Sequence, residues 1–460
     1  MEREGRPQGC AALYALFAVV VLASASGNLS QTAVNAMLSD IMGDFGMAVD
    51  LGQWLTTSYM LVLGVTVPVA TYLSRRFSVR QHVFIALSFF LAGVLADLLA
   101  PNFPVLLGGR ICQAISTGML MPLMQTIAMT RFPHGRQATA MGIAGIAMGF
   151  APNIGPTIGG AMSFAWGWRS FFVLLAAVLL VLAAASAIVI KPSDAPDRTA
   201  RLDIVSLALS TLGFGGLLLA FSDASSFSFE SPFIWAPLVL GALFLVLFVR
   251  RQNRVDDPLI SMDIFKSKQY RAGFIVQNLL NASFMGVTLV VPLYVEGLCG
   301  GTALEAGIVL LPGTVAALVL NPLAGVLTDR VGARPVTLVS GAFLAAGAVL
   351  MSFLEADTPL YVVTLCQAVR AIGVSGLVGP LTSWCLADLP RPIVSDGSSF
   401  CIAARQACAS LGTSVMVFII TIVGATSAGL ADPALAYQLA FGFSAVMAVA
   451  TFGYIVAKVR

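Results

Sequence analysis

Fourteen apolar stretches, each long enough to cross a lipid bilayer, constrain this chain more than any other feature. A bilayer core about 30 Å thick needs about 20 apolar residues in one helix, and only helices and closed barrels can satisfy their backbone there. Hydrophobic residues make up 58% of the sequence and charged residues 10%, against about 25% charged residues in soluble domains. We therefore predict an all-α polytopic membrane protein. The predicted spans are residues 11–38, 52–72, 82–99, 104–128, 137–160, 170–190, 203–221, 232–249, 272–295, 303–326, 335–354, 359–385, 398–424 and 437–457.

The placement of charge predicts how these spans are oriented. If the N-terminus is cytoplasmic, 21 of the 25 Lys and Arg residues fall in cytoplasmic segments, and the outer loops keep only Arg169. Positive residues concentrate on the cytoplasmic side of membrane proteins, and one missed span would scramble the pattern. We therefore expect fourteen spans with both termini in the cytoplasm.

Residues typical of enzymes and metal sites are scarce. The only two histidines, His82 and His134, lie at predicted helix ends, and the seven cysteines show no Cys-x-x-Cys spacing. We recognise no nucleophile–base pair and no phosphate-binding loop. We therefore expect no enzymatic activity, no metal, no cofactor and no nucleic-acid partner.

The chain contains an internal repeat. V-P-V-A-T-Y-L-S-R-R at 67–76 matches N-P-L-A-G-V-L-T-D-R at 321–330, and R-I-C-Q-A-I-S-T-G-M-L-M-P at 110–122 is echoed by R-A-I-G-V-S-G-L-V-G-P at 370–380. Internal repeats are the usual architecture of secondary transporters. The predicted division is an N-terminal six-helix bundle (11–191), a linker with two extra helices and a basic cytoplasmic loop (192–270), and a C-terminal six-helix bundle (271–457).

Short motifs along the chain resemble those of one carrier family. G-V-L-T-D-R-V-G-A-R at 325–334 resembles the loop motif of the major facilitator superfamily, and G-F-A-P-N-I-G-P-T-I-G-G at 149–160 resembles its antiporter signature. Arg110 with Gln113 resembles its membrane-embedded arginine motif. G-W-R-S-F-F, R-Q-A-C-A-S-L-G and the two inserted helices resemble the fourteen-helix drug-exporter branch, the EmrB/QacA type. The resemblance implies two six-helix bundles around a central cavity, with two peripheral helices.

Polar side chains inside the predicted spans are the candidate transport pathway. At 100° per residue, four of them on the first span fall within about 100° of arc, so we expect this stripe to line the cavity. The resemblance implies that Arg110 takes part in coupling protons to substrate. The amides of the ninth span are expected either to line the cavity or to bridge helices, and Arg405 either to contact substrate or to hydrogen-bond within the protein. The full candidate set is Asn28, Gln31, Thr32, Asn35, Arg110, Gln113, Gln125, Gln277, Asn281 and Arg405.

An acid that the family resemblance leads us to expect is missing. Fourteen-helix exporters tend to read Leu-Asp-x-Thr-x-x-Asn on the first helix, but here Ser30 stands at the acidic position, on the side opposite the polar stripe. All 22 Asp and Glu residues lie in loops or within about two turns of a predicted helix end. A proton-coupled carrier needs a carboxyl whose pKa burial has raised. The remaining candidates for coupling, each also interpretable as an ordinary interfacial charge, are Asp97, Asp223, Glu296, Asp40 and Asp44.

Two further segments are candidate gating elements. The fifth span contains small residues that let helices approach closely and prolines that kink them: Gly149, Pro152, Gly155, Pro156 and Gly159. It is expected either to bend and gate or simply to pack tightly. In the loop motif, Asp329 is expected to accept hydrogen bonds from Arg330 or Arg334 and from a neighbouring helix N-terminus, which would hold the bundles together.

Two arginines depart from the expected pattern. In the first-half copy of the loop motif, Arg75 stands where the acid belongs, so the usual clasp is not expected there. Arg370 lies near a predicted helix end, from which it could extend to the surface; otherwise we expect it either to hydrogen-bond within the protein or to contact substrate.

These observations predict a secondary active transporter in a bacterial cytoplasmic membrane. We expect it to export amphipathic organic compounds, drugs or related metabolites, by alternating access. Buried arginines without buried acids favour neutral or anionic substrates. The expected partners are a small-molecule substrate, a coupling proton and the bilayer, with the protein a monomer. Two alternatives stay open: a facilitator or importer of an organic anion on the same fold, and a membrane sensor or assembly partner that does not transport.

Overall fold

The computed structural model of the chain is a bundle of long helices. It describes residues 10–47, 49–190, 203–223, 232–255, 257–426 and 432–459. Within these ranges, 13 helices are long and apolar enough to cross a membrane, and Ile204–Ala220 is a shorter apolar helix. The predicted all-α polytopic fold is confirmed. The side chain of Asp223, one of the candidate acids, lies outside what the structure describes.

The first half of the chain forms α1 to α7, and the inserted pair follows. One span is continuous through three elements, because α5 runs through a π-helix into α6. The inserted helix α8 packs against its partner α9 and also against α2 and α14, one helix from each half. The bounds are α1 (Cys10–Phe45), α2 (Val49–Arg76), α3 (Val79–Leu98), α4 (Phe103–Thr130), α5 (Gln137–Gly145), the π-helix η1 (Ile146–Phe150), α6 (Ala151–Trp166), α7 (Arg169–Val189), α8 (Ile204–Asp223) and α9 (Pro232–Gln252).

The second half repeats the arrangement of the first. A short 3₁₀-helix leads into α10, which itself ends in a π-helix. The bounds are η2 (Met262–Lys266), α10 (Lys268–Leu293), the π-helix η3 (Tyr294–Leu298), α11 (Ala303–Val331), α12 (Ala333–Met351), α13 (Leu360–Ala387), η4 (Arg391–Ile393), α14 (Val394–Gly424) and α16 (Ala434–Lys458).

Local sequence determines several helix boundaries. Ser78 with Gln81 starts α3, and Thr302 with Glu305 starts α11, each through a capping box in which side chain and backbone satisfy one another. Gly332 ends α11 with a φ of 89°, a conformation that favours glycine because it has no Cβ. The chain can therefore turn sharply from α11 into α12.

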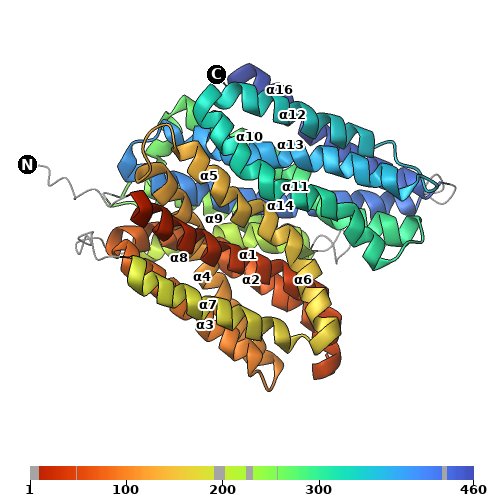
Figure 1. Cartoon of the computed structure of the whole chain (residues 1–460), viewed down its shortest axis with the longest axis horizontal. Coiled ribbons are helices and arrows are strands. Elements are labelled where there is room, and N and C mark those ends of the chain that lie inside the picture. The colour runs from red at the N-terminus through yellow and green to blue at the C-terminus, as the bar shows by residue number, and fades with distance from the viewer. Residues whose placement is uncertain are drawn as a thin grey trace, which may run out of the picture.

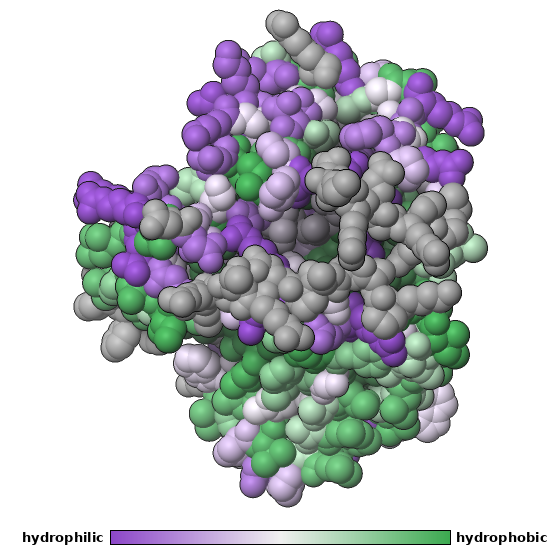
Figure 2. Space-filling model, turned by 90° about the vertical axis from the view of Figure 1, so that its left-hand side faces the viewer, coloured by the Kyte–Doolittle hydropathy of each residue, from purple (hydrophilic) through white to green (hydrophobic). Residues whose placement is uncertain are grey.

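Helix α1 begins and α16 finishes at one end of the bundle, which we call the termini end (Figure 1). In Figure 1 this end is on the left, with α3 and α7 at the bottom and α12 and α16 at the top. Helix α2 finishes there with Arg75 and Arg76, and α9 finishes with Arg250 and Arg251. Figure 2 looks at this end and shows hydrophilic residues gathered on it, with hydrophobic residues covering the adjoining flank. This is the surface of a protein whose flank faces lipid.

Candidate functional site

A buried polar network lies between α1, α3 and α4. The Arg110 guanidinium donates through Nη1 to Gln113 Oε1 (2.9 Å) and Ser30 Oγ (3.0 Å). The Ser30 hydroxyl donates to Gln113 Oε1 (2.8 Å), and Gln113 Nε2 donates to Asp97 Oδ2 (2.7 Å). All four side chains are fully buried. The network therefore links the Asp97 carboxyl group to the Arg110 guanidinium through the Gln113 amide.

Asp97 is the acid of this network. The sequence left it as an interfacial charge or a coupling acid, and in the structure its side chain is completely buried near the end of α3. Its Oδ1 atom has no hydrogen-bond partner among the described residues. Room for this oxygen depends on Gly109, because a Cβ there would collide with it. The family resemblance led us to expect an acid at position 30 of α1. The structure instead has a buried acid on α3, Asp97, which is linked to Arg110 through Gln113.

An aromatic ring completes the surroundings of Arg110. The guanidinium lies over the Tyr59 ring, 4.4 Å from its centroid, which favours the cation. The Tyr59 hydroxyl donates to the Gly27 carbonyl (2.9 Å) and shares a 2.7 Å hydrogen bond with Thr117. These contacts fix α2 and α4 against α1 at the depth of Ser30.

The predicted stripe on α1 makes mostly local contacts. Asn28 donates to the Ser24 carbonyl, and Thr32 donates to carbonyls of its own helix. Asn35 is exposed and accepts from Thr56 Oγ1 (2.7 Å), while Gln31 is buried. The stripe therefore extends from the packed interior to an exposed position near α2.

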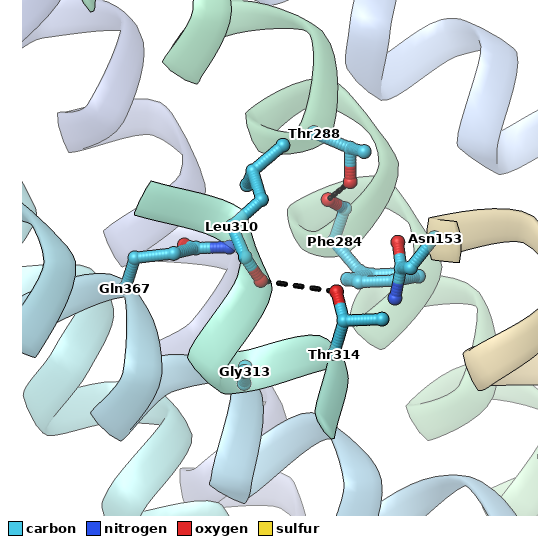
Figure 3. Close-up of a pocket in the computed structure, with 8 residues that line it drawn as sticks. Asn153, Phe284, Thr288, Leu310, Gly313, Thr314 and Gln367 are labelled. Atoms are coloured by element: carbon cyan, nitrogen blue, oxygen red, sulfur yellow. Dashed lines mark hydrogen bonds between the residues drawn. The ribbon is translucent and has the colours of Figure 1, made fainter. Parts of the chain in front are cut away.

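A small cavity between the halves is formed by other residues (Figure 3). One wall comes from α6 and the others from α10, α11 and α13. Its lining is Asn153, Phe284, Thr288, Leu310, Gly313, Thr314, Gln367 and Ala371. An adjoining cavity shares part of this lining and adds Gly149 and Asn321. None of the predicted pathway residues lines these two cavities, although Gly149 of the gating set does.

The remaining pathway candidates lie on α4, α10 and α14. Gln277 accepts from Thr382 Oγ1 (3.2 Å), so this amide bridges α10 and α13, and Asn281 donates to the Gln277 carbonyl (2.8 Å). Gln125 accepts from Ser398 Oγ (2.6 Å) and thereby joins the two halves. The guanidinium of Arg405 faces the thioether of Met148, at 3.8 and 3.9 Å.

Arg370 does not reach the surface, so the expectation that it could was wrong. Its side chain is fully buried, because residue 370 lies well inside α13 rather than at its end. Sequence analysis also overlooked its partner, Gln367, and the cavity residues Asn153 and Phe284. The repeat held a usable signal, since Arg and Gln are three residues apart at 110 and 113 and, in reverse order, at 370 and 367.

Asp329 joins the halves at the termini end. It accepts from the backbone N–H groups of Ala138 (3.1 Å) and Thr139 (2.7 Å), and from the Thr139 hydroxyl (2.5 Å). These groups form the first turn of α5, where the helix dipole favours a negative charge. Arg330 and Arg334 are exposed, and neither forms an ion pair with Asp329 among the described residues.

A second clasp stands where the usual one was not expected. Arg75, which replaces the acid of the loop motif, donates through Nη2 to both carboxylate oxygens of Asp396 (2.9 and 2.7 Å). Asp396 lies fully buried in the first turn of α14 and also accepts from the Ser261 backbone N–H (2.8 Å). Beside this pair, Thr71 donates to Ser399 Oγ (2.7 Å). The clasp is present with its charges exchanged between the helices.

The glycine-rich fifth span contacts both halves. Gly142 lies against the backbone of Gly325 on α11, and Gly155 lies against Thr32 and the Leu29 carbonyl on α1. The π-helix η1 separates these two contact regions, and π-helical turns occur frequently at functional sites. Gly159 continues the α1 contact at Ala33, and the prolines Pro152 and Pro156 both lie in α6.

Comparison with known proteins identifies the family. The model of the Major Facilitator Superfamily matches residues 20–414. The chain belongs to the major facilitator superfamily. This superfamily member is 34% identical to the MFS-type transporter YcnB of Bacillus subtilis, over 85% of the chain and 83% of that protein. It is 32% identical to the lincomycin resistance protein LmrB of Listeria monocytogenes, over 88% of the chain and 86% of that protein.

A solved structure supports the same fold. The crystal structure of the human organic anion transporter MFSD10 superposes with a TM-score of 0.69 over 97% of this superfamily member and 100% of that chain, at 14% identity. At this identity the likeness concerns the fold alone. The protein is thus a multi-pass membrane transporter of the superfamily, and it binds small molecules within the membrane.

Proposed function

We propose that this superfamily member exports amphipathic organic compounds, drugs or related metabolites, across a bacterial cytoplasmic membrane by alternating access. The single observation that carries the proposal is that contacts between the halves close the termini end beneath a cavity that both halves line. The similarity to a lincomycin resistance protein supports export. The proposal places both termini in the cytoplasm, treats 11–191 and 271–457 as the moving bundles with 192–270 between them, and takes the carrier to be a monomer.

We assign proton coupling to Asp97. This carboxyl is buried, has one oxygen without a partner, and is one amide away from the Arg110 cation. A change in the packing of α3 against α4 would alter the distance between acid and base, and with it the preference for the protonated acid. Gln113 would then pass the change from Asp97 to Arg110 and Ser30.

Substrate is proposed to follow the polar residues between the halves. Arg405 is the strongest candidate for contact, because its guanidinium has only a thioether as described partner. Gln125, Gln277, Asn281 and the stripe on α1 would complete the path as the halves rock. The clasps at Asp329 and at Arg75 would break when the termini end opens.

The proposal is tested with the purified protein in proteoliposomes under an imposed pH gradient, with lincomycin and amphipathic dyes as probes. The native chain is expected to accumulate a probe against its gradient. Asp97→Asn should abolish accumulation while leaving counterflow, because exchange needs no net proton movement. The matched control is Asp263→Asn, an exposed acid paired with Lys266 on η2. Accumulation that persists in Asp97→Asn would remove Asp97 from the coupling step.

A further inference from the structure

Arg370 is a buried cation that pairs with no acid among the residues that the structure describes. Its Nε donates to Gln367 Oε1 (3.0 Å), and the Phe284 ring centroid lies 5.7 Å from the guanidinium carbon. Nη1 and Nη2 have no hydrogen-bond partner, and no ion pair involves Arg370 in the part of the chain that the structure describes. A charge buried without a partner is costly. The site is therefore suited to an anion from outside the chain.

The surroundings of Arg370 differ from those of Arg110, the matching arginine of the first half. Arg110 occupies the matching place in the first half, where it bonds to Ser30 and Gln113 and lies one amide from Asp97. Arg370 keeps the amide partner, as Gln367, and an aromatic ring, as Phe284. No described acid lies at the position that would correspond to Asp97 beside Arg370.

The cavity of Figure 3 lies next to this cation. Gln367 and Phe284, both labelled in Figure 3, line the cavity, and each of them also contacts the Arg370 guanidinium. The rest of the lining offers an apolar surface from Leu310 and hydroxyls from Thr288 and Thr314. The cavity is about the size of one or two water molecules, so an amphipathic molecule would enter only as the halves separate, with its apolar part between them and its charged group toward Arg370.

We infer that Arg370 binds the carboxylate of an amphipathic substrate held in this cavity. Nη1 and Nη2 form the end of the guanidinium that meets both oxygens of a carboxylate side by side, while Gln367 occupies Nε. Gln367 both lines the cavity and contacts the guanidinium, so it is a second position at which the site can be tested. The inference rests on the proposed function, since the ligand is a transported compound, and it specifies amphipathic carboxylates as one class of its substrates.

The test is the melting temperature of the full chain in detergent, with sodium benzoate as the probe. Benzamide is the neutral isostere, and sodium chloride supplies an inorganic anion. Benzoate is expected to raise the melting temperature saturably, by about 2 °C at ten times its apparent Kd. Benzamide and chloride should leave it unchanged, because neither presents two anionic oxygens.

Three variants decide the assignment. Arg370→Met should abolish the benzoate shift. Since that variant could fail to fold, Gln367→Glu supplies a second readout: its carboxylate should pair with Arg370, raise the melting temperature without ligand and remove the benzoate shift. Gln252→Glu is the matched control, a buried glutamine that bonds to Ser206 and to the Ile260 backbone N–H. It should keep the shift.

Several results would contradict the inference that Arg370 binds a carboxylate. An equal shift from chloride would assign the site to inorganic anions and overturn the carboxylate inference. No benzoate shift in the native chain, or a shift that persists in Gln367→Glu, would leave Arg370 a purely structural cation. Loss of flux in proteoliposomes with the benzoate shift intact would count against transport and not against this site.

Discussion

Two copies of one loop motif close the same end of this transporter by different chemistry. Between α2 and α14 the closure is made by side chains, with Arg75 paired to the buried Asp396. Between α11 and α5 it is made largely by backbone, where Asp329 accepts from N–H groups and Gly142 lies against Gly325. Both copies of the motif form a contact between the halves at this end. The charge at the matching position differs, since it is positive at Arg75 and negative at Asp329.

The largest effect is expected from Arg75→Asp, which turns the side-chain clasp into a repulsion. Two carboxylates would face each other, one of them fully buried, and removing one partner of a buried ion pair costs about 3–5 kcal/mol. The termini end should open. The measurement is the distance between spin labels at His134 and Arg334, two exposed positions at this end in opposite halves.

The control for this prediction is the double variant Arg75→Asp/Asp396→Arg. It restores opposite charges in the order that the loop motif normally has, so it should bring back part of the short label distance. A single variant that leaves the distance distribution unchanged would show that this pair does not hold the end closed.

The next effect is expected from Gly325→Ala in the backbone clasp. A Cβ at residue 325 would collide with the carbonyl oxygen of Ala138, and overpacking of this kind costs about 1–3 kcal/mol. The same label pair should report a larger open fraction. Gly307→Ala on the same helix has open space around its Cβ and should leave the distance as it is; opening in both variants would argue against a steric cause.

A smaller effect is expected from Asp329→Asn. The single amide oxygen can replace only one of the two carboxylate oxygens that accept from the first turn of α5, so one hydrogen bond is lost together with the negative charge at the helix N-terminus, at a cost of about 1 kcal/mol. Thermal melts and label distances should therefore change little, while Asp329→Ala, which also removes the acceptor, should open the end further. Equal behaviour of the two variants would show that the hydrogen bonds contribute nothing.

The smallest effect on closure is expected from the Asp203–Arg251 pair, which joins α8 to α9 and not the two halves. Hydrogen bonds from Arg251 (2.8 and 3.0 Å) hold the pKa of Asp203 below its ordinary value. The stabilisation is therefore complete above about pH 4, the unfolded value, and is lost as the pH falls toward the folded pKa. Arg251→Gln should remove this dependence of the melting temperature on acid pH. The distance between the labels at His134 and Arg334 should not change; a change would show that the Asp203–Arg251 pair helps to close the termini end.

Prediction from sequence succeeded for features that repeat along the chain. The length of each apolar stretch identified the helices, because the residues of one segment are enough to show that it can span a membrane. The order of the motifs identified the family. Helix ends were less accurate: the first predicted span, 11–38, continues to Phe45 in α1, since the polar residues after 38 extend the helix beyond the apolar stretch.

The site was predicted less well, because its key contacts join residues far apart in the chain. Arg75 and Asp396 lie 321 positions apart, and no local pattern indicates that one will neutralise the other. Asp97 looked interfacial because it is near the end of α3, yet packing of α4 through Gly109 encloses it. Burial of an ionisable group depends on the neighbouring helices, which hydropathy along one helix does not describe.

The π-helix η1 has a mechanical consequence for the fifth span. A π-turn contains one residue more than an α-turn, so converting Ile146–Phe150 to α-helical hydrogen bonds would rotate α5 relative to α6 by about 100°. Since Gly155 and Gly159 hold α6 against α1, the rotation would fall on α5 alone and carry Gly142 away from Gly325. A change of η1 from π-helical to α-helical hydrogen bonds would thus rotate α5 about its axis. The rotation would separate α5 from α11, and so one half from the other, without unfolding either helix.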